Sequence, residues 1–370
     1  MKKIVFSLFS LSSFCAFAQD AKPDVISPEV LSDKQVVFRI YAPKAESVKL
    51  SSDDKWDKID FKKDSRGVWE GVWDNVQPGA YRYRFVVDGV NVYDPAAPTA
   101  RETTALLTMT SGDDFFAMKD DVAHGAISQR HYYSKTVKQT RRLHVWTPPG
   151  AELSKEALPV FYLIHGGGDK DNAWSTIGCA ANILDNLFAE GKIVPMIVVM
   201  PNGSVESETE TMLEKVPIFK DDLINDIIPF IESNYNVYKD AEHRAIMGLS
   251  FGGLETLEAV TAHPEAFDYV GVLSSGWWIS DTWFKKRGTR DDISLRIKRL
   301  KETASTFNES VKILYFTQGG PEDLAYENGM ETLKLFDAAG IKYKYSESPG
   351  GHTWMVWRKN LWDLAPLLFK

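Results

Sequence analysis

The sequence predicts two domains: a small all-β sandwich, followed by an α/β domain built on a mostly parallel sheet. From about Pro23 to Ser111, apolar and polar residues alternate in short segments separated by turn residues, as in antiparallel strands. From about Gly125 onward, short apolar segments alternate with longer helical ones, as in parallel strands joined by helices. A chain of 370 residues is long enough for about two such domains.

Five segments of the first domain have the period of two that is typical of strands. They are residues 36–42, 48–50, 68–73, 81–87 and 90–93. Asp88-Gly89 separates the last two and favours a tight hairpin turn. We therefore place the sandwich at residues 19–112 and a linker at residues 113–125.

The second domain is expected at residues 126–370. Its predicted strands are residues 158–164, 196–200, 245–247, 269–273, 311–316 and 341–345, and its predicted helices are residues 221–234, 253–260, 293–303 and 324–339. Residues 158–164 are almost entirely apolar, which indicates a strand buried on both faces of the sheet.

The N-terminus has the pattern of a secretory signal peptide. Lys2-Lys3 precedes an apolar run, and Ala16-Phe17-Ala18 matches an Ala-x-Ala cleavage site. Cleavage there would remove residues 1–18, so we expect an exported protein, periplasmic or secreted. Cys179 would then be the only cysteine, so stability must come from core packing rather than from an internal disulfide.

Charge and composition exclude several classes of partner. The formal net charge of −8 disfavours nucleic acid and anionic membranes, because both require a basic face. Beyond the signal peptide the sequence has no apolar run of membrane-spanning length. It also has no His, Cys and Asp cluster with metal-ligand spacing. We therefore expect no membrane insertion, no metal and no other cofactor.

Gly248-Leu249-Ser250-Phe251-Gly252 carries the strongest chemical signal. An apolar strand segment precedes it and a helical segment follows it. A Gly-x-Ser-x-Gly between a strand and a helix is a nucleophile elbow, in which the glycines allow a sharp turn that exposes the serine hydroxyl. Ser250 is therefore the candidate nucleophile.

A serine nucleophile needs a histidine to take its proton and a carboxylate to orient that histidine. His352 is the only histidine after His263, and it lies in a loop that follows a predicted strand. His263 lies at the end of a helix, where a structural role is expected. The acid is Asp323 or Glu322, and we favour Asp323 because it lies deeper in the turn before the next helix. The other acid would serve as a helix cap.

The glycine-rich loop after residues 158–164 is the candidate oxyanion hole. Gly166 and Gly167 are expected to supply one backbone N–H, and Phe251, which follows the nucleophile, supplies the other. His165 is interpreted as a structural residue that braces this loop.

Four tryptophans are candidates for the substrate pocket because they follow predicted strand ends or the His352 loop. They are Trp174, Trp277, Trp278 and Trp354. A flat aromatic acyl group would stack well against such side chains. The alternative interpretation is that most of them belong to the core.

The second domain resembles carbohydrate esterase family 1, a branch of the α/β-hydrolases that contains feruloyl and acetylxylan esterases. The matching stretches are residues 162–168 with Trp174, 198–203, 244–253, and 349–354 with Trp357. The resemblance implies an α/β-hydrolase fold with Ser250 as nucleophile, Asp323 as acid and His352 as base. It places the oxyanion donors on Phe251 and on the loop at Gly166-Gly167. Phe251 departs from the methionine that is common in the family, and the neighbouring Glu322 keeps the assignment of the acid open.

The first domain resembles family 48 carbohydrate-binding modules, which have an early-set, immunoglobulin-like sandwich. Residues 38–43 and 81–89, followed by Asp94-Pro95, carry this weaker match. Candidate sugar-stacking residues are Trp56, Trp69, Trp73, Tyr81, Tyr83 and Tyr93. In strands, alternate aromatic residues usually point into the core, so a buried role is the default.

Together these resemblances imply a serine esterase that releases ferulic or related hydroxycinnamic acid from plant cell-wall polysaccharide such as arabinoxylan. One alternative is an acetylxylan esterase or another carboxylic ester hydrolase on the same fold, with a siderophore ester hydrolase disfavoured by the acidic charge. A second alternative is a non-catalytic glycan-binding protein, which would not need the complete set of Ser250, Asp323 and His352.

Overall fold

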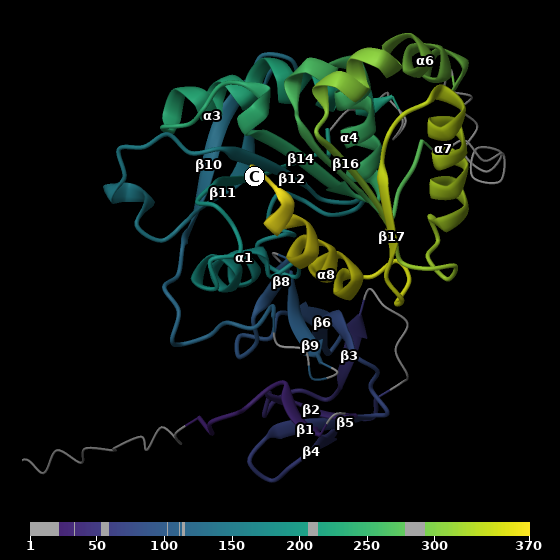
Figure 1. Cartoon of the computed structure of the whole chain (residues 1–370). Helices are drawn as coiled ribbons and strands as arrows, with labels where there is room; N and C mark the ends of the chain where they lie inside the picture. The colour runs from purple at the N-terminus through teal and green to yellow at the C-terminus, as the bar shows by residue number, and fades with distance from the viewer. Residues whose placement is uncertain are drawn as a thin grey trace, which may run out of the picture.

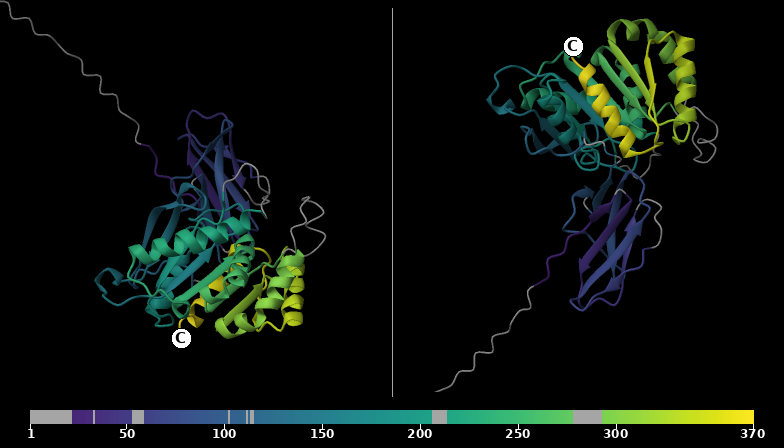
Figure 2. Two further views of the ribbon diagram at one scale, coloured as in Figure 1. Left: turned by 90° about the horizontal axis from the view of Figure 1, so that it is seen from above. Right: turned by 60° about the horizontal axis from the view of Figure 1, so that its bottom comes forward.

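The computed structural model describes residues 22–32, 34–52, 59–101, 103–110, 112, 115–205, 214–277 and 293–370, without the side chains of 293–296. These residues form a β-sandwich and an α/β domain, which Figures 1 and 2 show as two bodies in contact. The predicted fold class is thus confirmed. The predicted signal peptide, residues 1–18, lies outside the described residues.

The sandwich consists of two antiparallel sheets. One has the order β1 (Glu29–Ser32), β2 (Gln35–Tyr41), β5 (Val68–Asp74), β4 (Lys62–Lys63). The other has the order β3 (Val48–Ser52), β6 (Gly79–Val87), β9 (Thr104–Met109), β8 (Thr99–Arg101), with β7 (Val90–Val92) also paired to β6. Phe38, Tyr83 and Phe85 lie in the core between the sheets. The five predicted strands are present within two residues.

The sequence pattern missed the other four strands for identifiable reasons. β1 is an exposed edge strand, and β4 and β8 have only two and three residues. β9 is buried at nearly every position, so its sequence does not alternate.

The α/β domain contains an eight-stranded sheet. Its order is β10 (Ala126–Ser134), β11 (Gln139–Thr147), β13 (Ile197–Pro201), β12 (Val160–Ile164), β14 (Arg244–Leu249), β15 (Tyr269–Leu273), β16 (Ile313–Gln318), β17 (Lys344–Glu347). The two strands at the β10 end are antiparallel and the other six are parallel. The parallel strands bring the loops at their carboxyl ends to one edge of the sheet, where such folds place their chemistry.

Helices cover both faces of this sheet (Figure 1). On one face lie α2 (Lys215–Asp222), a π-helical turn (Leu223–Ile227), α3 (Ile228–Asn234), α4 (Phe251–Ala262), α6 (Ile293–Ser310) and α7 (Tyr326–Ala339). On the other lie α1 (Ala180–Ala189) and α8 (Trp354–Leu364). Short 3₁₀ turns are at Ala151–Leu153, Ala241–His243, Pro264–Ala266 and Ala365–Leu367. Among the described residues, no helix combines the length and apolarity needed to cross a membrane.

The sequence pattern does not predict helix α8, because its first residue, Trp354, directly follows the glycine-rich loop of His352. The structure shows that Trp354, Val356, Trp357 and Leu361 of this helix are buried. The helix therefore begins almost at His352, and this position brings its first turn to the candidate active site.

The segment between the domains packs on the α/β domain. The ring of Phe115 contacts Trp362 of α8 at 5.4 Å between centroids, and Asn186 Nδ2 of α1 donates to the Phe115 carbonyl at 2.8 Å. Directly between the domains, Thr176 Oγ1 donates to the carbonyl of Ala100 in β8 at 2.8 Å. The sandwich is therefore docked on the face of the α/β domain that carries α1 and α8.

Candidate active site

Ser250 lies in the sharp turn between β14 and α4. Its φ of 50° is in the left-handed region, which a residue with a side chain rarely adopts. Close approach of the backbone makes the flanking glycines necessary: a Cβ on Gly248 would lie 2.0 Å from the Gly252 carbonyl oxygen. The strained turn exposes the hydroxyl at the carboxyl end of β14, as the elbow motif predicts.

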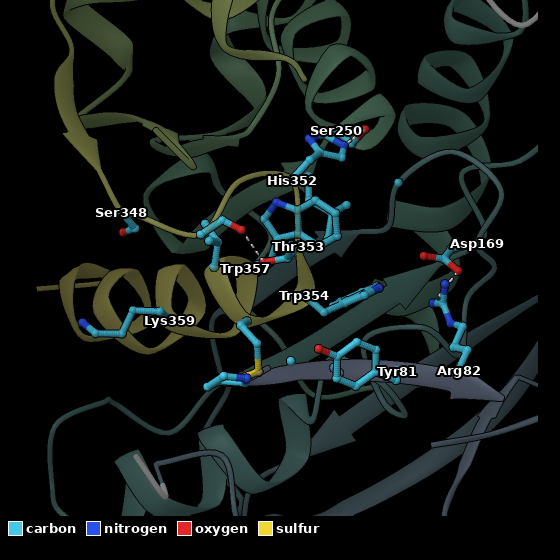
Figure 3. Close-up of a pocket in the computed structure, with 18 of the residues that line it drawn as sticks. Tyr81, Arg82, Asp169, Ser250, Ser348, His352, Thr353, Trp354, Trp357 and Lys359 are labelled. Atoms are coloured by element: carbon cyan, nitrogen blue, oxygen red, sulfur yellow. Dashed lines mark hydrogen bonds and ion pairs between the residues drawn. The ribbon is translucent and has the colours of Figure 1, made fainter. Parts of the chain in front are cut away.

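The structure brings Ser250, His352 and Asp323 into one hydrogen-bonded chain. His352 Nε2 lies 2.9 Å from Ser250 Oγ, and His352 Nδ1 lies 2.7 Å from Asp323 Oδ1. Asp323 is buried and also accepts backbone hydrogen bonds from Gly319 and Ala325. Burial alone would raise the pKa of Asp323, but hydrogen bonds, first that of His352 and then others that include the Ala325 N–H, lower it below its usual value. An ionised carboxylate of Asp323 therefore faces His352. Figure 3 shows His352 and Ser250.

Glu322 has a different position. Its Oε1 accepts a hydrogen bond from the backbone N–H of Gly350 at 3.0 Å, in the loop that carries His352. Of the two acids that the sequence leaves open, Asp323 is the one hydrogen-bonded to His352, while Glu322 braces the loop that carries it. His263 is the C-terminal cap residue of α4, as its predicted structural role requires.

The glycine loop lies directly against the nucleophile. A Cβ on Gly166 would lie 3.2 Å from Ser250 Cβ and 2.6 Å from Leu249 Cδ1, so a side chain here would displace Leu249 and crowd Ser250. Gly167 lines the same cavity as Ser250. The backbone N–H of Phe251 is the first of α4, while its side chain is buried in the core. The geometry places all three predicted oxyanion residues beside Ser250.

His165 braces this loop, as the sequence predicts. Its Nδ1 lies 2.8 Å from the carbonyl oxygen of Gly166, and its Nε2 accepts from the N–H of Gly203 at 3.0 Å. A carbonyl can only accept and a backbone N–H can only donate, so the ring is the neutral tautomer protonated at Nδ1. Burial lowers the pKa of His165 in agreement with this state.

Two of the four predicted substrate-binding tryptophans are core residues, and for them the prediction is wrong. Trp174 is 1% exposed, donates to the Ile164 carbonyl at 3.1 Å and supports Trp354 edge-to-face. Trp277 is also 1% exposed and packs on Phe336 of α7. Both follow strand ends, but their side chains turn inward, a direction that position in the sequence does not reveal. Trp278 lies outside the described residues.

The remaining tryptophan, Trp354, lines the cavity that contains Ser250 and His352. Trp357 lines it as well and contacts the His352 ring edge-on at 4.9 Å between centroids (Figure 3). Trp357 was not among the tryptophans predicted for the pocket. Its i, i+3 spacing from Trp354 on a helix could have indicated it.

The cavity has a volume of about 770 Å³, and both domains line it. Tyr81, Arg82 and Arg101 of the sandwich contribute to its wall, together with the loop residue Asp169 (Figure 3 labels all but Arg101). From the sequence, Tyr81 is a candidate only for sugar binding within the sandwich. No sequence signal places these sandwich residues at the active site, because they precede Ser250 by about 150 residues or more.

The other described sugar-stacking candidates of the sandwich are engaged elsewhere. Trp73 and Tyr83 are buried. Trp69 Nε1 donates to the Ala42 carbonyl at 3.1 Å, and Tyr93 Oη donates to the Ala97 carbonyl at 2.9 Å. Trp56 lies outside the described residues. The described residues also contain no group of three or more His, Cys, Asp or Glu side chains that could hold a metal ion.

A buried glutamate follows the elbow. Glu255 of α4 is 1% exposed, and its carboxyl oxygens have no hydrogen-bond partner among the described residues. Burial raises the pKa of Glu255 well above its ordinary value, and the charge of Arg141 offsets this effect only in part. Glu255 is therefore expected to keep its proton in the folded protein.

Replacing Glu255 with glutamine is expected to make stability less dependent on pH. Above the ordinary pKa of glutamate, the carboxyl ionises in the unfolded chain but not in the folded one, so the folded state binds more protons. The free energy of unfolding of the wild type therefore falls as pH rises, by up to about 1.4 kcal/mol per pH unit, until the raised pKa is passed. Chemical denaturation of both proteins at several pH values measures this difference. Parallel profiles would show that Glu255 is charged in the folded protein.

Comparisons with known proteins agree with this architecture. The profile of the Esterase family matches residues 134–368, and that of carbohydrate-binding module 48 (isoamylase N-terminal domain) matches residues 26–97. The chain is 32% identical over 363 residues to an endo-1,4-beta-xylanase/feruloyl esterase of Xylanibacter ruminicola, covering 93% of this chain and 46% of that protein. It is 26% identical over 255 residues to endo-1,4-beta-xylanase Y of Acetivibrio thermocellus, covering 63% and 22%. The chain thus spans less than half the length of these two relatives.

Solved structures show the same fold. A CE1 ferulic acid esterase from Anaeromyces mucronatus is 19% identical, with a TM-score of 0.59 over 70% of this chain and 96% of that one. The enterobactin esterase of Shigella flexneri is 16% identical, with a TM-score of 0.62 over 92% of this chain and 95% of that one. The second match therefore includes the sandwich as well as the α/β domain.

Proposed function

This chain belongs to the Esterase family, and we propose that it is a serine esterase that releases ferulic or related hydroxycinnamic acid from plant cell-wall polysaccharide such as arabinoxylan. The hydrogen-bonded chain from Ser250 through His352 to Asp323, open to a cavity with tryptophan walls, carries the proposal. The similarity to a relative named xylanase/feruloyl esterase supports the choice of substrate.

The proposed reaction has two acyl-transfer steps. Ser250 Oγ attacks the ester carbonyl carbon while His352 Nε2 takes its proton, and the carbonyl electrons move onto the oxygen. The N–H groups of Phe251 and of the Gly166-Gly167 loop stabilise this oxyanion. When the intermediate collapses, His352 returns the proton to the leaving alcohol. Water then attacks the acyl-enzyme in the same way, which releases the acid and restores Ser250.

The walls of the cavity favour an aromatic acyl group. Trp354 and Trp357 lie next to His352, so a planar ring attached to the reacting carbonyl would pack against indole faces or edges. The volume of about 770 Å³ lies within the usual range of small-molecule sites, so the cavity has room for an aromatic acyl group. The complete triad argues against a protein that only binds glycan.

Hydrolysis of methyl ferulate and of p-nitrophenyl acetate by the purified protein tests the proposal. We expect release of ferulate with a higher kcat/KM than release of acetate, because only the ferulate ring contacts the tryptophans. Activity on acetate alone would replace the proposal with an acetylxylan-type esterase. The absence of activity on both would favour a glycan-binding role or another acyl group.

A further inference from the structure

Two arginines of the sandwich hold the loop that carries the oxyanion glycines. Arg82 Nη2 lies 2.7 Å from Asp169 Oδ1, and Arg101 Nη2 lies 2.9 Å from the same oxygen. Asp169 is 7% exposed and follows Gly166 and Gly167 by two to three residues in the α/β domain. Charge-assisted hydrogen bonds from two guanidinium groups hold this buried carboxylate in one place. Both guanidinium groups belong to the other domain.

Asp169 is in turn coupled to the oxyanion hole through the backbone. Its N–H donates to the carbonyl of Gly166 at 3.3 Å, and the His165 ring donates to the same carbonyl. The peptide group is planar and trans, so the direction of the Gly166 carbonyl determines the opposite direction of the Gly167 N–H. A shift of Asp169 would therefore turn a candidate oxyanion donor away from the reacting carbonyl.

Arg82 also reaches the other half of the catalytic apparatus. Its guanidinium lies over the ring of Trp354 at 5.9 Å from the centroid. Figure 3 shows both side chains. Trp354 is the first residue of α8 and follows His352 by two residues. One side chain of the sandwich thus contacts both the loop of the oxyanion glycines and the helix that begins next to the general base.

We infer that Arg82 and Arg101 are positioning residues for the chemical step: through Asp169 the sandwich sets the geometry of the oxyanion hole. This inference rests on the proposed function, in which Ser250 attacks an ester carbonyl. It assigns the sandwich a role in catalysis, separate from any binding of carbohydrate. A role in substrate binding would act on KM, whereas a role in positioning acts on kcat.

Four variants of the full chain test the inference. Asp169→Asn keeps the shape of the side chain and removes the charge that both arginines face. Arg82→Met removes one guanidinium, and Arg82→Lys restores its charge. Thr176→Val is the control, because it removes a hydroxyl that lies 2.8 Å from the Ala100 carbonyl of the sandwich and 2.7 Å from the Asn172 carbonyl of its own segment, and it leaves Asp169 and both arginines unchanged.

Two readouts separate this inference from the proposed substrate. The first is kcat and KM for methyl ferulate, well below the unfolding temperature of each variant. The second is the rate at which an alkyl fluorophosphonate labels Ser250. The tetrahedral phosphorus of this probe places an oxygen in the oxyanion hole, and no particular acyl group is needed.

We expect Asp169→Asn and Arg82→Met to lower both kcat and the labelling rate by about 10- to 100-fold, with KM changed less than about threefold. Arg82→Lys should recover part of the loss, and Thr176→Val should stay near the wild type. A loss confined to KM, an equal loss in Thr176→Val, or lower stability with unchanged kcat and labelling would overturn the inference.

If the wild type is labelled but does not cleave ferulate, the proposed substrate is wrong. The labelling rates of the variants then decide whether Arg82 and Asp169 position the oxyanion hole. If the wild type is not labelled, both proposals are wrong.

Discussion

Replacement of Ser250 by alanine is expected to lower kcat by about a millionfold, as loss of the nucleophile does in other serine hydrolases. Without Oγ no acyl-enzyme can form, and His352 has no hydroxyl to deprotonate. KM should change little, because the cavity walls remain. The slow residual reaction would come from the oxyanion donors and from substrate binding.

Kinetics on methyl ferulate and the location of a fluorophosphonate label measure this effect. Ser305→Ala is the control, because Ser305 is an exposed residue of α6 that donates to Glu309 and does not line the cavity. It should keep kcat within about threefold of the wild type, because a surface substitution away from the site usually changes the free energy of unfolding by less than about 0.5 kcal/mol. A Ser250→Ala protein that keeps more than about one hundredth of kcat would exclude Ser250 as the nucleophile.

Asp323→Asn is expected to lower kcat by about ten thousandfold while the protein stays folded. An asparagine amide can donate to His352 Nδ1 and thereby favour the tautomer that cannot accept the proton of Ser250. It also removes the negative charge that stabilises the imidazolium formed in the reaction. The 2.7 Å contact between Asp323 Oδ1 and His352 Nδ1 is the basis of this prediction.

Glu322→Gln is the matched control, since it makes the same chemical change at the neighbouring residue. The introduced glutamine would keep an oxygen that can accept from the N–H of Gly350, so kcat should fall less than about tenfold. Measured kcat and its pH profile for both variants decide the assignment. If Glu322→Gln caused the larger loss, Glu322 would be the acid of the triad.

Much of the chemistry could be predicted from the sequence because its signals are local. The elbow needs a strand, two glycines, a serine and a helix in direct succession, so sequence order contains its geometry. The glycine loop at Gly166-Gly167 and the loop of His352 each follow a strand, and parallel strands bring such loops to one edge. Asp323 and Glu322 could not be separated in this way, because the direction of each side chain depends on how the turn packs against the loop of His352.

The sequence by itself therefore predicted the two-domain fold, the elbow that carries Ser250, the loop of His352 and the glycines that lie beside them. Tertiary structure alone decided which acid meets His352, which tryptophans face the cavity and which become core. It also decided that Arg82 meets Asp169, although 87 residues separate them. The physical reason is that local conformation follows from neighbouring residues, whereas a contact between domains depends on the packing of whole sheets and helices, which no short segment of sequence encodes.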